Sequence, residues 1–162
     1  MKYFKFIILL SATLVLVCFQ SQAKDITTSQ NLITISDAWV RATNPGQEVG
    51  AAYMTLLSRE DLTLVSVESS VTNSVEIHNM TMENGVMKMR MLENLTLKTG
   101  EPFKLAPGGF HLMLFDLKIP LSVGEQVQFT LHFKSNTKTK KSVEYQQTIN
   151  VVVKTPTESA NH

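Results

Sequence analysis

Two histidines and six methionines gather in one segment of this chain, between residues 76 and 118. The chain has eight methionines in all; Met1 is the initiator and Met54 lies earlier in the body of the chain. Thioether sulfur is a soft ligand and imidazole nitrogen a borderline one, and both suit Cu(I), whereas calcium, magnesium and manganese prefer oxygen. The segment therefore has the side chains for a Cu(I) site without a thiolate.

The first half of this segment predicts a β-hairpin. Residues 75–82 and 86–92 flank Asn84-Gly85, the strongest short hairpin signal that a sequence offers. A two-residue turn makes Glu83 face Val86, and facing residues point to the same side of a sheet. All soft side chains then share one face, in the facing pairs Met82 with Met87, Met80 with Met89, and His78 with Met91. The other face carries the polar residues Asn79, Thr81, Lys88 and Arg90, which we expect to face water.

A second piece of the segment, residues 110–117, supplies further donors. It is nearly continuous apolar sequence, which predicts a central strand buried on both faces. His111 and Met113 are two positions apart, so a strand projects both to one side, where they can close on a single ion. Simpler interpretations remain open, because methionine also fills gaps in cores and a core histidine can be satisfied by hydrogen bonds.

The remaining sequence predicts an all-β domain. We expect a loose polar arm at 24–30, a solvated basic loop at 134–141, and no helix. Strands are expected at 32–35, 38–42, 51–57, 62–71, 127–133 and 143–153, with two extended pieces within 95–105. Many short strands separated by turn signals indicate an antiparallel β-sandwich or Greek-key barrel.

The N-terminus predicts a secretory signal peptide at residues 1–23. A basic head precedes an apolar run that ends near small residues at Ala23. The run is shorter than the ~20 apolar residues that a membrane span needs, so we expect cleavage and no span in the mature chain. Lipidation at Cys18 is disfavoured because the bulky Val17 precedes it. A β-domain at 24–154 and a disordered tail at 155–162 would remain.

Composition excludes several classes of function. Cys18 is the chain's single cysteine and would leave with the signal, so the mature domain has no disulfide, no thiolate ligand and no electron-transfer copper site of the cysteine type. The formal charge of +1 for the whole chain becomes about −1 after cleavage, which argues against nucleic acid or anionic lipid as a partner. We expect no enzyme, because no nucleophile motif or carboxylate pair is recognisable.

The spacing of four donors resembles a known family. His78, Met89, His111 and Met113 match the H-x10-M-x21-H-x-M signature of the periplasmic copper chaperones called PCuAC. The resemblance covers nearly the whole mature chain. It extends through Asp37 to Ala42, Gly50 to Met54, Gly85 to Arg90, and Pro107 to Met113.

The resemblance implies a cupredoxin-like β-barrel that holds one Cu(I) near the surface through His78, Met89, His111 and Met113. Family members deliver copper to the CuA centre of cytochrome c oxidase, so subunit II of that oxidase and Sco-type proteins are the expected partners, in the periplasm. Some members add a Cu(II) site in a tail rich in histidine and methionine. The tail of this chain has one histidine and no methionine, so we do not extend that site to it.

Two expectations concern residues outside the four donors. Met80, Met82, Met87 and Met91 are expected to serve as packing or as soft surroundings of the ion. Trp39 and Arg41 are expected to serve core packing and an ion pair. Two other functions remain open: a periplasmic copper-sequestering or resistance protein, and a metal-free structural β-sandwich.

Overall fold

The computed structural model describes residues 26–28, 32–136 and 142–156, and this part of the chain is all-β. Its strands are β1 (Ile26–Thr28), β2 (Ile33–Arg41), β3 (Gly50–Ser58), β4 (Leu62–Ser69), β5 (Ser74–Glu83), β6 (Val86–Leu92), β7 (Leu95–Leu97), β8 (Pro102–Leu105), β9 (Phe110–Phe115), β10 (Gln126–Ser135) and β11 (Glu144–Lys154). Within the described ranges there is no helix long and apolar enough to cross a bilayer.

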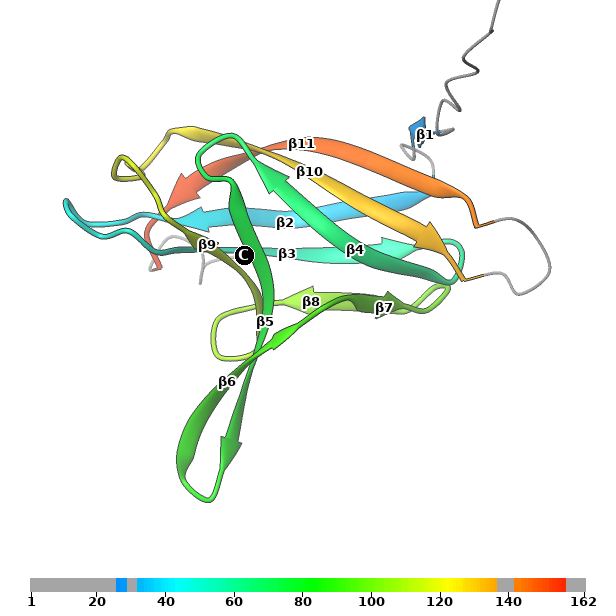
Figure 1. The fold of residues 1–162 in the computed structure, drawn as a ribbon, viewed down its shortest axis with the longest axis horizontal. Coiled ribbons are helices and arrows are strands. Elements are labelled where there is room, and N and C mark those ends of the chain that lie inside the picture. Colours follow the sequence, from blue (N-terminus) through cyan, green and yellow to red (C-terminus); the bar gives the residue numbers. More distant parts are fainter. Residues whose placement is uncertain (1–25, 29–31, 137–141, 157–162) are drawn as a thin grey trace, which may run out of the picture.

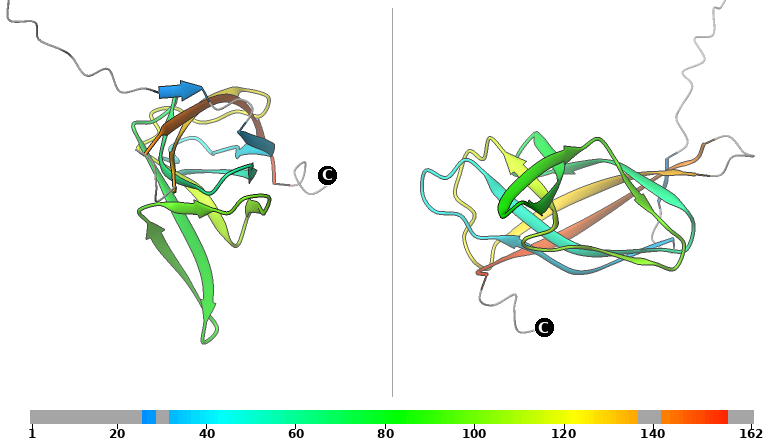
Figure 2. Two further views of the ribbon diagram at one scale, coloured as in Figure 1. Left: turned by 90° about the vertical axis from the view of Figure 1, so that its right-hand side faces the viewer. Right: turned by 90° about the horizontal axis from the view of Figure 1, so that it is seen from below.

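The strands form one continuous path, β6-β5-β9-β3-β2-β11-β10-β4-β7. Outside this path, β1 pairs with β11 and β8 pairs with β3. The path folds over so that its two halves cover one another, and the strands surround a common centre when viewed end-on (Figure 2, left). The halves join where β2 and β11 run parallel, at Val40 with Val153 and Arg41 with Lys154. The expected β-sandwich or barrel is therefore the observed architecture.

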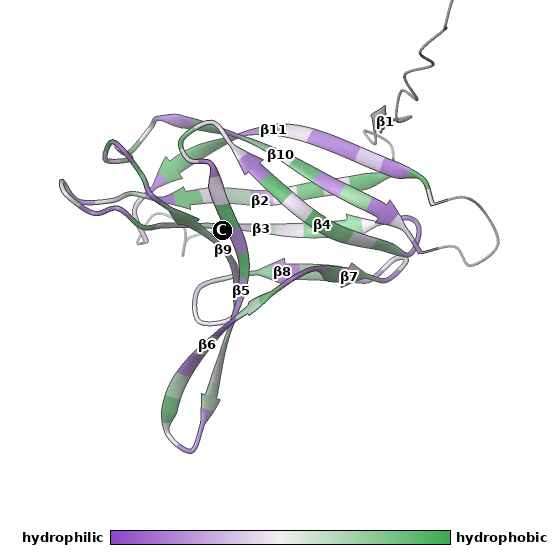
Figure 3. Cartoon of the chain, viewed as in Figure 1, coloured by the Kyte–Doolittle hydropathy of each residue, from purple (hydrophilic) through white to green (hydrophobic). Residues whose placement is uncertain are grey.

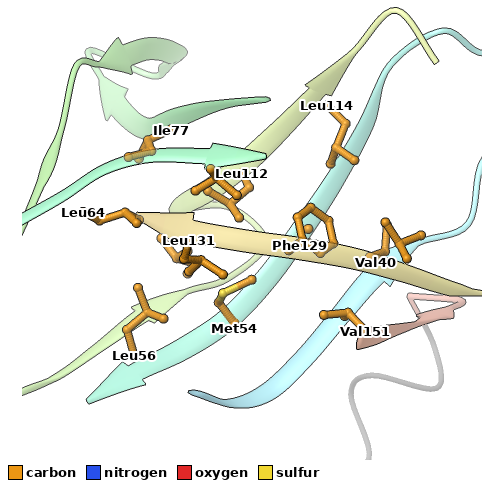
Figure 4. Close-up of a cluster of buried hydrophobic side chains, with 14 of the residues drawn as sticks. Val40, Met54, Leu56, Leu64, Ile77, Leu112, Leu114, Phe129, Leu131 and Val151 are labelled. Carbon is orange, nitrogen blue, oxygen red and sulfur yellow. The ribbon is translucent and has the colours of Figure 1, made fainter. Parts of the chain in front are cut away.

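The core lies between these halves and follows the alternation of the strands. On β10, Val127, Phe129, Leu131 and Phe133 are all buried, while Gln126 and Gln128 are exposed. Figure 4 shows Phe129 and Leu131 beside Met54, Leu112 and Leu114 from the opposite half. Every second residue of β3 and β9 thus faces the core, and the residues between them face the outside of the sheet.

Three details differ from the sequence-based expectations. The two strands expected at 32–35 and 38–42 form one strand, β2 (Ile33–Arg41), whose register is irregular at Asp37, where φ is 51°. The expected loose arm contains β1, which pairs in parallel with β11. Strand β9 lies inside the sheet between β5 and β3, but the side chains of Phe110, Met113 and Phe115 are only partly buried.

Strands β5 and β6 form the predicted hairpin with the predicted register. Glu83 faces Val86, Met82 faces Met87, Met80 faces Met89, and His78 faces Met91. Asn84 and Gly85 have φ of 52° and 78°, the two positive values that a type I′ turn requires. The hairpin projects away from the rest of the domain (Figures 1 and 2).

Some expectations concern residues that the structure does not describe. These are the signal peptide at 1–23 with Cys18, the centre of the basic loop at 137–141, and the tail from residue 157 onward.

Candidate metal centre

Strands β5 and β9 bring the two histidines of the motif together. The two strands are antiparallel neighbours, and His78 lies directly opposite His111. Their ring centroids are 5.8 Å apart with an angle of 45° between the planes. Facing residues point to the same side of a sheet, so both rings lie on the outer face, opposite the core residues Ile77 and Leu112.

Each ring has one nitrogen held by an acceptor. The Nδ1 of His111 lies 3.0 Å from the carbonyl oxygen of Gly109, and the Nε2 of His78 lies 2.7 Å from a carboxylate oxygen of Glu76. Carbonyl and carboxylate oxygens accept hydrogen bonds, so these two nitrogens carry the protons. The lone pairs are therefore on Nε2 of His111 and Nδ1 of His78.

Burial makes the free nitrogen of His78 unusual. His78 and His111 are only 9% and 4% exposed. The Nδ1 of His78 is buried and has no hydrogen-bond partner within the described part of the chain. A buried polar atom without a partner is costly, and a bound metal ion would remove that cost.

The thioethers of the motif line a cavity beside these rings. Its volume is about 380 Å³. Residues lining the cavity include Met80, Met89, His111 and Met113, together with Arg41 and Tyr53. Three of the four predicted donors therefore share one cavity; His78 is outside its lining but lies next to His111. Ala51 faces Met113 across β3 and β9, and its small side chain leaves room at this position.

A larger cavity of about 800 Å³ lies on another part of the surface. Trp39, Met54, Lys104 and Lys154 are among its lining residues, and none of the four predicted donors is. Its single soft side chain, Met54, is 1% exposed and belongs to the core. We therefore place the candidate metal centre at the smaller cavity, where the soft donors gather.

The hairpin methionines do not behave as core residues. Met82, Met87, Met89 and Met91 are 63%, 48%, 46% and 56% exposed, whereas Met54 points into the core (Figure 4). Figure 3 shows the alternation of polar and apolar residues along the projecting hairpin. Of the two roles expected for Met82, Met87 and Met91, core packing is therefore wrong, because the hairpin extends beyond the layer that could cover them. A role as soft surroundings of the ion stays a prediction. Met80 is partly buried beside the cavity.

Sequence reasoning missed the contribution of Tyr53 and underestimated that of Arg41. The guanidinium carbon of Arg41 lies 5.7 Å from the centroid of the Tyr53 ring, and that ring stacks on the buried Trp39 with centroids 4.5 Å apart. Burial raises the pKa of Tyr53, and the charge of Arg41 opposes this rise. A neutral phenol and a cation thus border the cavity. The available signal was that both residues lie in stretches that the family resemblance covers, Asp37 to Ala42 and Gly50 to Met54.

The donors gathered at the cavity are thioether sulfurs and imidazole nitrogens. No group of three or more His, Cys, Asp or Glu side chains that could hold a metal occurs among the residues that the structure describes. The soft donors are neutral, and Arg41 adds a positive charge at the cavity. Neutral sulfur and nitrogen donors suit a soft monovalent cation such as Cu(I).

Comparison with known proteins identifies the family. The family model described as "Putative lipoprotein LpqE-like" matches residues 33–145, and the chain belongs to this family. "Putative lipoprotein Lxx21020" of Leifsonia xyli subsp. xyli is 30% identical over 102 residues, which cover 62% of this chain and 61% of that protein. The chain thus spans about three fifths of that relative. "Uncharacterized protein RP573" of Rickettsia prowazekii is 31% identical over 125 residues, covering 72% and 68% of the two chains.

Solved structures confirm the expected cupredoxin-like fold. The copper-bound PCuAC domain from PmoF2 superposes with a TM-score of 0.57 at 25% identity, covering 76% of this chain and 93% of that domain. Apo-DR1885 from Deinococcus radiodurans superposes with a TM-score of 0.50 at 26% identity, covering 98% and 99%. The chain therefore has a PCuAC-like fold.

Proposed function

We propose that this protein is an exported Cu(I) chaperone whose ligands are His78, Met89, His111 and Met113. The observation that carries the proposal is the pair of buried histidines on facing strands, each with one nitrogen free for an ion. Met89 and Met113 line the cavity beside His111. The similarity to a copper-bound PCuAC domain supports the same cargo.

The histidines have separate tasks in this proposal. His111 offers Nε2, and its Nδ1 proton is held by the backbone of Gly109. His78 offers Nδ1, and its Nε2 proton is held by Glu76. Acceptors that fix the tautomer of a ligating histidine also orient the ring and raise its basicity. Glu76 and Gly109 therefore position the two nitrogens for the ion.

Met89 gives the site its means of release. Its side chain is 46% exposed, so a ligand from another protein can reach the ion from this side. Four neutral ligands leave the charge of Cu(I) uncompensated, which favours transfer to an acceptor that offers thiolates. Following the family resemblance, we propose that the acceptor pathway is assembly of the CuA centre in subunit II of cytochrome c oxidase, together with Sco-type proteins.

We also propose that the protein acts in the periplasm after export. The support is the basic and apolar pattern of residues 1–23 and the family's description as lipoprotein-like. Mass spectrometry of the N-terminus of the exported protein tests this proposal. We expect an unmodified N-terminus that begins near residue 24. A chain that begins at a diacylated Cys18 would contradict cleavage near Ala23 and show that the protein is a lipoprotein.

A competition titration tests the metal centre. Mature protein, residues 24–162, is titrated with Cu(I) against bathocuproine disulfonate, a chromophoric Cu(I) chelator. We expect one tight equivalent in the wild type and a loss of affinity of about 100-fold or more in His111→Ala, as removal of a direct ligand exceeds the ~10–100-fold typical of outer partners. His132→Ala is the matched control, because that ring lies 3.2 Å from Glu68 on another part of the fold. Equal Cu(I) affinity in all three proteins would show that His111 is not a ligand.

Deletion of the gene tests the chaperone role. If the protein delivers copper, its deletion should abolish cytochrome c oxidase activity, and added copper should restore that activity because free ion then replaces the delivered ion. If the protein sequesters copper, the deletion strain should keep normal oxidase activity and become more sensitive to copper.

A further inference from the structure

The tip of the β5–β6 hairpin carries a second pair of thioethers. Met82 and Met87 face each other across the two strands. They are 63% and 48% exposed, and the hairpin that carries them projects away from the domain (Figure 1). Neither side chain therefore fills a core.

The opposite face of the hairpin has an ordinary solvent-exposed surface. Glu83 pairs with Lys88 at 2.7 Å and with Arg90 at 3.3 Å. An exposed strand that needed apolar residues would favour β-branched ones, which also lose less side-chain entropy than methionine on ordering. The property that Met82 and Met87 add to this face is their sulfur.

We propose that Met82 and Met87 form a separate, weaker site for Cu(I) or another soft monovalent cation, and that this site loads the candidate metal centre. The inference rests on the proposed function, because it assumes the same cargo. Directly opposed strand residues have Cβ atoms about 4.5–5.5 Å apart. Methionine is long and flexible, so both sulfurs can close on one ion, and Cu(I) accepts two-coordination.

The spacing along the hairpin separates the tip from the centre. Strands rise about 3.4 Å per residue, so the Met82 position is roughly 14 Å from the His78 position along β5. On β6 the tip residue Met87 is two positions, about 7 Å, from the proposed ligand Met89. The tip and the candidate metal centre therefore lie close together but use different side chains, so each can hold its own ion.

Another thioether pair lies between the tip and the histidines, and one of its members, Met89, is itself a proposed ligand of the candidate metal centre. Met80 faces Met89, and both line the cavity of the candidate metal centre. Each step from Met82 to Met80 and from Met80 to His78 is about 7 Å along β5. The pairs thus form a ladder of soft donors on one face, along which an ion can pass from solvent to the buried histidines by exchange of one sulfur at a time.

Leucine variants separate metal binding from apolar docking. Met82→Leu with Met87→Leu keeps the apolar area of the tip but removes both sulfurs. A second copy of the chain or a protein partner would still bind such a surface, whereas a soft cation would not.

The experiment is a titration of the mature protein, residues 24–162, with Ag(I), a redox-stable probe, followed by NMR of methionine ε-methyl groups. We expect two Ag(I) per chain, with the second equivalent shifting the methyl signals of Met82 and Met87. The double leucine variant should bind one Ag(I), and the His111→Ala variant should keep the tip shifts. In stopped-flow mixing with a weak Cu(I) complex, the double leucine variant should load the centre about tenfold more slowly, since the ion then enters without the outermost donors.

Four other outcomes decide the inference. One Ag(I) per chain with unmoved tip signals overturns it and leaves the proposed function intact. Shifts at the tip alone support the cation site at Met82 and Met87 but contradict the four-ligand centre, and with it the loading role. Half an equivalent with a doubled mass in sedimentation would show an ion shared between two copies, which overturns a site within one hairpin. Unchanged loading by the double leucine variant overturns the loading role.

Discussion

His78 of β5 and His111 of β9 lie directly opposite each other, with ring centroids 5.8 Å apart. In both cases the residue two positions earlier supplies the acceptor that holds the ring proton: the carboxylate of Glu76 for His78, and the backbone carbonyl of Gly109, which precedes β9, for His111. Residues two apart point to the same face of a strand, so alternation along β5 places the Glu76 side chain beside the His78 ring. This arrangement prepares both free nitrogens before an ion arrives.

Removing the acceptor of His78 should weaken the proposed centre without removing a ligand. In Glu76→Ala we expect the Nε2 proton of His78 to lose its partner, the tautomer population to shift, and Cu(I) affinity to fall about 10–100-fold, as for other partners of metal-bound histidines. Long-range ¹H–¹⁵N NMR reports the tautomer and chelator competition reports the affinity. Glu83→Ala, on the opposite face of the hairpin, is the control. An unchanged tautomer with unchanged affinity would exclude a positioning role for Glu76.

Two neighbouring methionines on β6 should differ in their effect on Cu(I) affinity. Met89 lines the cavity with His111 and Met113, whereas Met91 faces His78 but is outside that lining. Met89→Leu keeps volume and removes sulfur, so we expect affinity to fall by more than about tenfold, while Met91→Leu changes it by less than about threefold. Isothermal competition titrations of the two variants check this. The reverse order would place Met91 in the site instead of Met89.

Replacing a buried methionine should destabilise the fold more than replacing an exposed one. Met54 is 1% exposed and Met87 is 48% exposed. We expect Met54→Ala to lower the free energy of unfolding by about 2–5 kcal/mol, because it leaves a cavity in the core. Met87→Ala should change it by no more than about 0.5 kcal/mol. Urea denaturation of both variants measures this difference, and equal losses would mean that the hairpin face is covered in solution.

The turn before β4 should contribute a pH-dependent part of stability. Hydrogen bonds from the backbone nitrogen and hydroxyl of Thr99, both 2.8 Å long, lower the pKa of Asp61. A folded-state pKa below the unfolded value stabilises the fold above the unfolded pKa of about 3.9, and this contribution is lost as pH falls through the folded value. Wild type should therefore exceed Asp61→Asn in stability at pH 7, and the difference should shrink below about pH 4. A difference independent of pH would contradict the role of the Asp61 charge.

The local patterns of the sequence determined the strands and the hairpin register. Asn84-Gly85 selects a type I′ turn, and that turn alone sets which residues of β5 and β6 face each other. Alternation along β10 likewise determined which side chains enter the core. Two features could not be read from the local sequence pattern. The irregularity at Asp37 and the parallel pairing of β1 with β11 depend on strands that are far away in the chain.

Only the tertiary structure decided which donors meet and which stay in water. The sequence placed His111 and Met113 on one face of a strand, but the pairing of β9 with β5 put His111 opposite His78. The sequence predicted that Met80, Met82, Met87 and Met91 serve as packing or as soft surroundings of the ion, because methionine is an adaptable filler. Here the hairpin extends past the domain, so its length relative to the opposing layer left Met82, Met87 and Met91 exposed. Pattern within a strand is a local property, whereas exposure depends on the whole fold.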